Sequence, residues 1–186
     1  DPDIPESKSD FFQTPSIERL AKMGLRFTDG YASHPNCSPS RAALLTGRSP
    51  AALKFTDICN RNTGPLYEGN RMIPAQHIDA LPAGEITLPE ILKQHLPRYR
   101  AAHFGKWHLG EDGPQSHGFD AGDGPTGNGA GSRHANLPDD PKLAFSVTKR
   151  GNEWMEQQVK SGAPFYLQIS HYATHLPYQS KPATKR

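Results

Sequence analysis

The sequence predicts an α/β fold, a layered sandwich in which a mostly parallel central sheet is flanked by helices. Helical and strand patterns alternate along the 186 residues, as is typical of parallel strands joined by helical crossovers. The 17 glycines and 18 prolines, beside 34% hydrophobic residues, indicate a globular protein with long loops. In such a fold, functional side chains are expected at the carboxyl ends of the strands.

Helices are predicted where apolar residues recur at helical spacing behind a capping signal. Residues 14–24 begin with Thr-Pro and end at a glycine, and residues 87–96 begin with Thr-Leu-Pro. Residues 141–160 form an amphipathic pattern, in which a break is expected near Gly151. These segments are the candidates to cover the sheet.

Strands are predicted at three places, the last of them apolar enough to be buried. They are residues 25–32, 99–105 and 164–172. Loop-rich excursions are expected at 49–86 and 110–141, and an irregular tail at 177–186. Long loops of this kind usually shape a site, so both excursions are candidates to line one.

Composition excludes some classes of function. The formal net charge is only +2, and the basic residues are scattered without interleaved aromatic residues, which argues against nucleic acid as a partner. No apolar stretch reaches the length of a membrane-spanning helix, and no signal peptide is visible. The two cysteines, Cys37 and Cys59, lack metal-finger spacing, and a disulfide between them stays open.

The segment "NCSPSRAALLTGR" at residues 36–48 places a cysteine at the start of a predicted helix. Pro39 fixes the backbone angle that a helix start requires, so Cys37 lies at or just before the helix N-terminus. The free N–H groups there attract anions, and Arg41, one turn on, matches a tetrahedral oxyanion. This pattern suggests phosphate or sulfate chemistry. An ordinary capped helix with a buried cysteine and a surface arginine explains the spacing equally well.

Two further segments carry candidate groups. In "GKWHLG", Lys106 and His108 are two residues apart at the end of a predicted strand, so both are expected to point the same way. In "SHYATHLPY", His171 and His175 follow the last predicted strand. Taken singly, each is explained by a solvated lysine or a structural histidine, and His117 has no assigned role. Their convergence with Cys37 on one pocket is the hypothesis that gives them a function.

Together these segments resemble a known family. "CSPSRAALLTGR" resembles the signature of the formylglycine-dependent (type I) sulfatases of the alkaline phosphatase superfamily, and "GKWHLG" resembles their second signature. "TPSIERLAKMGLRFTDGYA", "HGFD" and "PFYLQISHYATHLPY" are similar to other segments of that family. The resemblance spans roughly residues 12–180. It implies an alkaline-phosphatase-like fold, incomplete here, with residues 1–186 as an N-terminal or middle fragment of the catalytic domain.

The resemblance implies a sulfuric ester hydrolase that cleaves an aryl or carbohydrate sulfate monoester. Cys37 would be oxidised by a maturing enzyme to formylglycine, whose hydrated aldehyde attacks sulfur and later expels sulfate. Arg41 would hold the formylglycine, Lys106 would contact the sulfate, and His108 would orient the formylglycine hydroxyls. His175 would bind sulfate or assist the leaving group, with His171 the weaker match for that role.

The family's metal, usually calcium, would have Cys37 as formylglycine among its ligands, while the family's paired acidic ligands are absent from this chain. The 186 residues alone are therefore expected not to turn over sulfate esters. Two alternatives stay open: a phosphonate or phosphodiester hydrolase of the same superfamily, and a truncated, non-catalytic sulfatase-like protein. The segment 55–85 resembles one in bacterial sulfatases that act on sulfated carbohydrates, and family resemblance favours a periplasmic or secreted location.

Overall fold

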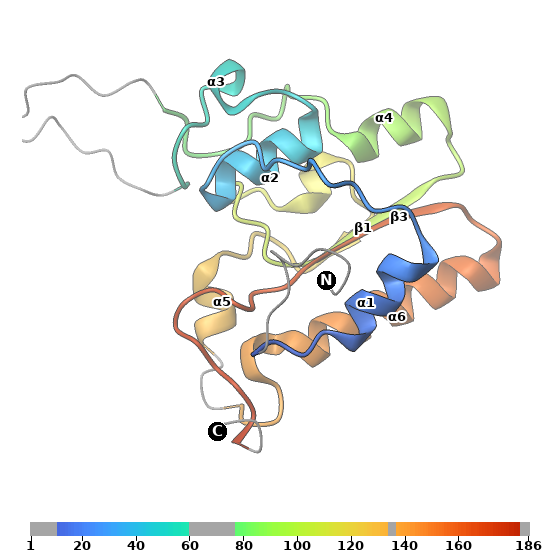
Figure 1. Ribbon diagram of the computed structural model, residues 1–186. Coiled ribbons are helices and arrows are strands. Elements are labelled where there is room, and N and C mark those ends of the chain that lie inside the picture. The colour runs from blue at the N-terminus through green and yellow to red at the C-terminus, as the bar shows by residue number, and fades with distance from the viewer. Residues whose placement is uncertain (1–10, 60–76, 134–136, 183–186) are drawn as a thin grey trace, which may run out of the picture. The chain divides into compact units, whose positions relative to one another are not determined.

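The computed structural model describes residues 11–59, 77–133 and 137–182 (Figure 1). The chain divides into a short unit, residues 1–32, and a larger unit, residues 33–186. The larger unit holds the sheet and every residue of the candidate active site.

The described sheet has three strands in the order β2-β1-β3, and all of its pairings are parallel. They are β1 (Arg100–Gly105), β2 (Ala121–Gly122) and β3 (Phe165–Ser170). Ala102 of β1 stands opposite Ala121 of β2 and Leu167 of β3. The predicted parallel sheet is therefore confirmed, with β1 in its centre.

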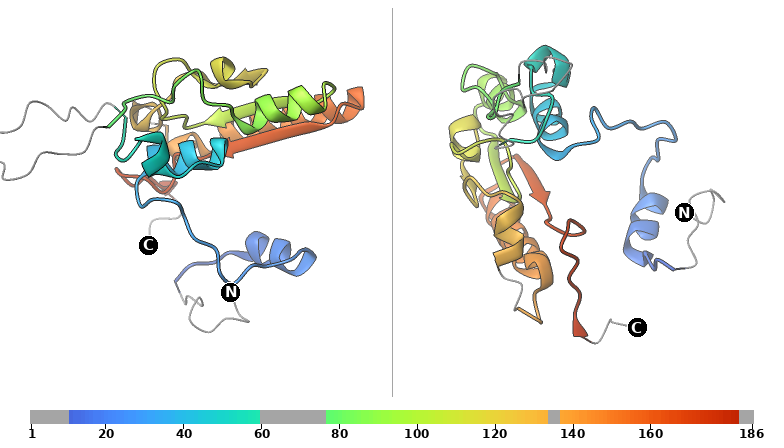
Figure 2. Two further views of the ribbon diagram at one scale, coloured as in Figure 1. Left: turned by 90° about the horizontal axis from the view of Figure 1, so that it is seen from above. Right: turned by 90° about the vertical axis from the view of Figure 1, so that its left-hand side faces the viewer.

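Helices cover both faces of this sheet. Figures 1 and 2 show α6 (Ala144–Ser161) along one face and α2 (Cys37–Thr46) and α4 (Leu88–His95) over the other. Alternate residues of β1 enter two separate cores, since successive side chains of a strand point to opposite faces. Ala101 packs with α2 residues, whereas Ala102 and Phe104 pack with Val147 of α6. The predicted α/β sandwich is confirmed.

Helix α6 is continuous through Gly151, so the predicted break is wrong. A Cβ atom at Gly151 would lie 2.5 Å from Cδ1 of Ile169 on β3. The glycine therefore serves the close approach of α6 to the strand and does not interrupt the helix. Strand β3 is half-buried along its length, whereas its apolar sequence predicts full burial.

The caps of α2 and α4 form as their sequences predict. Thr87 and Glu90 close a capping box at the start of α4, where the Thr87 amide donates to Glu90 Oε2 at 2.7 Å. Helix α2 ends at Gly47, which takes the left-handed conformation with φ of 67° and donates its N–H to the Ala43 carbonyl.

In the short unit, α1 (Pro15–Met23) begins after Thr14 and stops before Gly24, as predicted. The predicted strand at residues 25–32 is wrong, because these residues are irregular. A strand requires a neighbour for its backbone groups, and no strand of the described sheet pairs with this segment.

The two predicted loop excursions contain short elements. Within 49–86, α3 (Pro50–Leu53) forms, while residues 60–76, including most of the segment that resembles carbohydrate sulfatases, lie outside the described residues. The stretch 110–141 is not wholly irregular. It holds β2, η2 (Pro114–His117), α5 (Asn128–Arg133) and the start of η3 (Pro141–Leu143).

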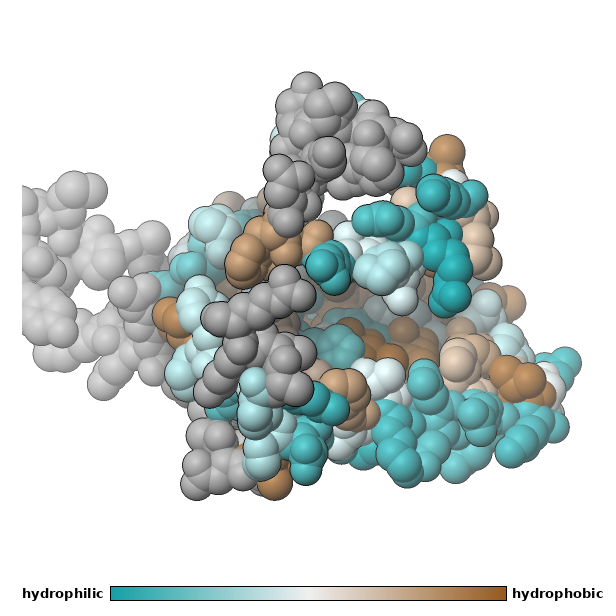
Figure 3. All heavy atoms as spheres, turned by 60° about the horizontal axis from the view of Figure 1, so that its bottom comes forward, coloured by the Kyte–Doolittle hydropathy of each residue, from teal (hydrophilic) through white to brown (hydrophobic). Residues whose placement is uncertain are grey.

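The described part of the predicted tail, residues 177–182, contains neither a strand nor an α-helix. Several large apolar side chains of the larger unit are exposed, among them Leu44, Phe145 and Val159. Hydrophobic residues are accordingly visible among hydrophilic ones in the space-filling view (Figure 3).

None of the helices in the described ranges is both long enough and apolar enough to cross a membrane.

Candidate active site

Cys37 is the first residue of α2, as its position before Pro39 predicts. Asn36, the N-cap, is extended, and its carbonyl accepts the Ser40 amide at 3.3 Å. The Cys37 side chain is half-buried, and as the first residue of α2 it belongs to the turn whose N–H groups lack helical partners. An anion at this position would be stabilised by those N–H groups and by the helix dipole.

The structure brings Lys106 and His108 to Cys37. Sγ of Cys37 lies 3.2 Å from Nδ1 of His108. The charge available at Cys37 and interaction with its side chain favour the protonated form of Lys106, so the two side chains are close. Lys106 is 3% exposed, so its ammonium group is held inside the protein at the thiol. The convergence predicted for these three residues is therefore present.

The backbone that carries Lys106 and His108 is not an extension of β1, contrary to the prediction from strand alternation. Gly105 ends the strand with φ of +94°, and a Cβ there would lie 2.1 Å from the Ser170 carbonyl oxygen. The Lys106 amide then donates to that same carbonyl at 2.8 Å. His108 has φ of +58°, a left-handed conformation that is uncommon for a residue other than glycine. A turn, and not pleating, therefore aims both side chains at Cys37.

Thr126 holds this turn in place. Its carbonyl accepts the amides of Trp107 at 3.1 Å and His108 at 2.8 Å. Its hydroxyl donates to the Gly105 carbonyl and accepts from the Trp107 amide. Thr126 lies in a glycine-rich run whose sequence carried no signal for this role.

Asp123 also holds this turn in place. Its carboxylate accepts the Gly105 amide at 2.8 Å and receives two hydrogen bonds from Arg150 of α6, at 2.9 and 2.7 Å. The Asp120 carboxylate accepts the Ala101 amide and pairs with Lys93. Both carboxylates support the fold.

Arg41 reaches the turn from α2. Its Nη1 donates to the Lys106 carbonyl oxygen. Burial lowers the pKa of Arg41, while the negative charge available at Cys37 opposes that shift, and the guanidinium stays charged at neutral pH. The one-turn spacing from Cys37 therefore does place Arg41 beside the cysteine, as the sequence predicts.

Burial sets the protonation of the two other groups. It lowers the pKa of Lys106, against the opposing pull of Cys37. Burial also lowers the pKa of His108 to about 4, helped by the charges of Lys106 and Arg41 and by His175. At neutral pH the imidazole of His108 is therefore uncharged, and can accept or donate one proton at Nδ1 according to its tautomer.

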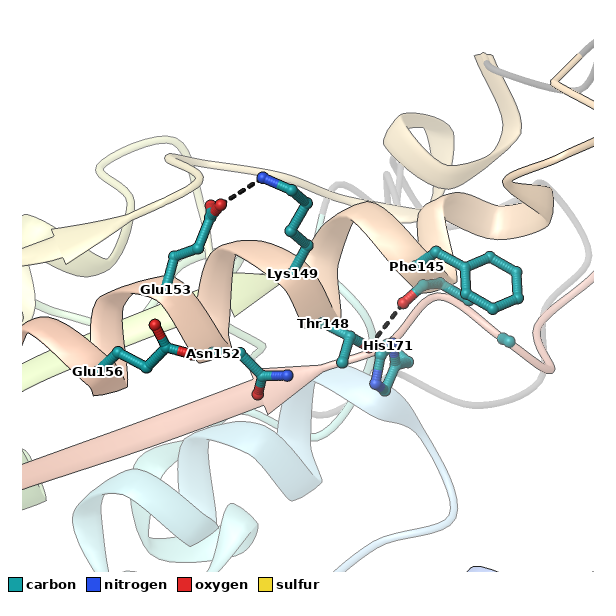
Figure 4. Close-up of a pocket in the computed structure, with 9 residues that line it drawn as sticks. Phe145, Thr148, Lys149, Asn152, Glu153, Glu156 and His171 are labelled. Atoms are coloured by element: carbon teal, nitrogen blue, oxygen red, sulfur yellow. Dashed lines mark hydrogen bonds and ion pairs between the residues drawn. The ribbon is translucent and has the colours of Figure 1, made fainter.

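His175 and His171 differ in their surroundings. His175 is exposed, its amide donates to the Tyr172 carbonyl at 2.9 Å, and its ring Nδ1 lies 2.8 Å from the Leu176 carbonyl oxygen. Among the influences that lower the pKa of His108, that of His175 is the smallest. His171 lines a different pocket, of about 790 Å³, whose other walls come largely from α6 (Figure 4).

His117 is a core residue, as the sequence allowed. It is 1% exposed, its ring stacks at 5.5 Å from that of Trp107, and its carbonyl accepts from Thr87 Oγ1 at 2.8 Å. It takes no part in the cluster at Cys37.

Cys59 contacts residues of the cluster at Cys37, and the sequence predicted no catalytic role for it. Its Sγ donates to the His108 carbonyl oxygen at 3.0 Å and lies 3.2 Å from Oγ of Ser38. Both cysteines are free thiols, so the disulfide that the sequence left open is not formed. Cys59 and His108 also share the wall of a cavity of about 400 Å³, whose other side comes from residues 123–130.

The described residues do not form a metal site by themselves. Within residues 11–59, 77–133 and 137–182, no group of three or more histidine, cysteine, aspartate or glutamate side chains lies close enough to hold a metal ion. Calcium therefore remains an expectation from the family resemblance.

Comparisons with known proteins place the chain in a family. The family model "Sulfatase" matches residues 6–186, so the chain belongs to the sulfatase family. Its relatives include N-acetylgalactosamine-6-sulfatase from Canis lupus familiaris, 32% identical over 91% of this chain and 37% of that protein. Arylsulfatase G from Homo sapiens is 28% identical over 93% of this chain and 39% of that protein. The chain thus spans less than two fifths of the length of either relative.

Solved structures confirm the fold. Ps i-CgsB superposes with a TM-score of 0.62 at 25% identity, over 91% of this chain and 42% of that one. Its complex with k-i-k-neocarrahexaose gives a TM-score of 0.63 at 24% identity, over 93% and 44%. The alkaline-phosphatase-like class predicted from the sequence motifs is therefore correct.

Proposed function

We propose that the protein hydrolyses sulfate monoesters through a formylglycine made from Cys37. The observation that carries this proposal is the meeting of Arg41, Lys106 and His108 around Cys37 at the N-terminus of α2. Two cationic side chains and a helix N-terminus favour an anion such as sulfate. The membership in the sulfatase family supports the same reaction.

The proposed reaction divides one difficult displacement into two steps. One hydroxyl of the hydrated formylglycine attacks sulfur, the bond between sulfur and the substrate oxygen breaks, and the alcohol leaves with a proton. The second hydroxyl then loses its proton, the aldehyde re-forms, and the bond between its carbon and the sulfate oxygen breaks to release sulfate. Water hydrates the aldehyde again.

In this scheme the side chains act by position and charge. Lys106 lies close enough to Cys37 for the two groups to interact electrostatically, and it would hold a sulfate oxygen as charge develops. The uncharged His108 would orient a formylglycine hydroxyl through Nδ1. Arg41 would hold the formylglycine and the turn that carries Lys106. His175 is proposed to protonate or bind the leaving group.

The substrate is proposed to be an aryl or carbohydrate sulfate. Support for a carbohydrate comes from relatives named N-acetylgalactosamine-6-sulfatase, of which the Homo sapiens protein is 40% identical over 58% of this chain and 20% of its own length. A maturing enzyme that oxidises Cys37 is the implied partner, calcium the implied metal, and a periplasmic or secreted location the implied setting. The metal would add Lewis-acid polarisation of sulfate.

The test is turnover by the complete gene product, produced in its own host. We expect hydrolysis of 4-nitrophenyl sulfate, little hydrolysis of a phosphonate monoester, and loss of turnover in Cys37→Ala. Peptide mass spectrometry of the active protein should show formylglycine at position 37. A protein that prefers the phosphonate monoester would support the other superfamily activity, and an unmodified thiol in a fully active protein would exclude the formylglycine mechanism.

A further inference from the structure

Cys59 joins the two segments that meet at the proposed nucleophile. Its amide donates to Oγ of Ser38, the residue that follows Cys37, at 3.1 Å. Its thiol donates to the carbonyl of His108, the residue whose ring contacts Cys37. One buried residue therefore ties the start of α2 to the turn after β1.

His108 needs such support because of its backbone. Its φ of +58° is uncommon for a side chain with a Cβ, and such a conformation persists where neighbours fix it. The Thr126 carbonyl holds the His108 amide and the Cys59 thiol holds the His108 carbonyl, so both peptide groups flanking this residue are tethered. The direction of the imidazole follows from these two peptide planes.

The thiol is suited to donate. Cys59 is 4% exposed, and its burial raises the pKa of the thiol, so the group keeps its proton at neutral pH. Sγ of Cys59 also contacts two groups at once, Oγ of Ser38 at 3.2 Å and the His108 carbonyl oxygen at 3.0 Å.

We propose that Cys59 is a positioning residue, which holds the imidazole of His108 against the side chain at position 37 through the His108 carbonyl. The inference rests on the proposed function for its effect on turnover. The geometry that it describes can be measured without turnover, because the unmodified protein has a thiol at position 37 that His108 also contacts.

The variants separate the hydrogen bond from the volume of the side chain. Cys59→Val fills the site with a somewhat larger apolar side chain and removes the donor, whereas Cys59→Ser keeps a donor. Leu53→Ala is the matched control, since Leu53 is 5% exposed in the same core cluster. His108→Ala and the double variant with Cys59→Val complete a double-mutant cycle.

Two readouts are applied to the complete gene product. The first is kcat for 4-nitrophenyl sulfate in the matured protein. The second is the rate at which iodoacetamide alkylates Cys37 in protein made without the maturing enzyme, followed by mass spectrometry of the peptide that contains it. We expect Cys59→Val to lower both by about three- to tenfold, because the imidazole no longer stays at position 37 to hydrogen-bond the side chain there.

In the His108→Ala background, Cys59→Val should change neither readout by more than about 1.5-fold, while Cys59→Ser should retain most of the wild-type value. Leu53→Ala should lower thermal stability and leave the alkylation rate close to wild type. Equal effects of Cys59→Val in both backgrounds, faster alkylation, or no effect would overturn the proposal. If the wild type has no sulfatase turnover, the proposed function fails, and the alkylation cycle still decides the role of Cys59.

Discussion

Sγ of Cys37 and Nδ1 of His108 lie 3.2 Å apart although 71 residues separate them in the chain. One belongs to the start of α2 and the other to the turn after β1, so the contact exists only when helix and sheet are packed together. The proposed chemistry therefore depends on the fold through a small number of bonds that can be altered one at a time.

Loss of the Lys106 ammonium should remove a donor from the proposed sulfate site. We expect Lys106→Ala to lower kcat/KM for 4-nitrophenyl sulfate by about 10² to 10³, as the removal of one oxyanion donor does elsewhere. Lys149→Ala is the control, because Lys149 is 71% exposed and pairs with Glu153 on the surface of α6. Activity within twofold of wild type in Lys106→Ala would exclude the assigned role.

Replacing Arg41 by lysine should show whether the guanidinium is needed as a fork or only as a charge. We expect Arg41→Lys to lower kcat/KM by about 10- to 100-fold, since lysine keeps the charge and cannot reproduce the planar donor set that reaches the Lys106 carbonyl. Arg98→Lys serves as control, because Arg98 is exposed and donates to the Gly162 carbonyl. Full activity in Arg41→Lys would show that charge alone suffices.

Gly105 and Gly47 offer a comparison of backbone demands. Both have positive φ, but a Cβ at Gly105 would lie 2.1 Å from a backbone oxygen, while nothing lies within 4 Å of one at Gly47. Gly47→Ala should cost about 1 kcal/mol of unfolding free energy. Gly105→Ala should cost more than about 3 kcal/mol and displace the turn that bears Lys106. Similar urea midpoints for the two variants would contradict the packing described at the end of β1.

His103 should make stability fall in mild acid. It is 1% exposed between Trp107 and Phe119, and burial lowers its pKa from 6.5 to about 4. As pH falls below 6.5, the unfolded chain binds the proton first, so stability is complete above that pH and is lost progressively towards pH 4. The loss at pH 5 relative to pH 7.5 should be about 2 kcal/mol.

This pH dependence can be isolated with His103→Phe. Urea unfolding of wild type and variant at pH 7.5 and 5 gives the difference in slope, whatever the absolute stability of the variant. An equal loss in both proteins would mean that His103 is not the titrating group.

The sequence predicted the positions of those side chains that local geometry alone is enough to place. A helix start fixes Cys37, and one helical turn fixes Arg41 relative to it, so spacing predicted where they lie, while their roles came from the family resemblance. The family motifs added Lys106, His108 and His175, whose roles remain predictions. The strand predicted at residues 25–32 failed because a strand depends on a neighbour that local sequence does not reveal.

The supports of the site could not be read from the sequence. Thr126 bonds to the turn from 19 residues away and Cys59 from 49. Neither has a spacing rule, since each contact arises from how a loop folds back over the sheet. The break predicted at Gly151 was wrong for the same reason. This glycine allows α6 to approach β3 closely, which the helix sequence alone does not reveal.

The turn from Gly105 to His108 is fixed by bonds to the Ser170 carbonyl, Thr126, Asp123 and Cys59. The charged side chains of the turn are therefore immobilised when the chain folds. Their conformational entropy is lost at that stage and not each time an anion binds. A preorganised environment of this kind needs little reorganisation as charge shifts between atoms. It also means that anion affinity and fold stability are coupled, so an anion that fits the turn should protect residues 105–108 from hydrogen exchange.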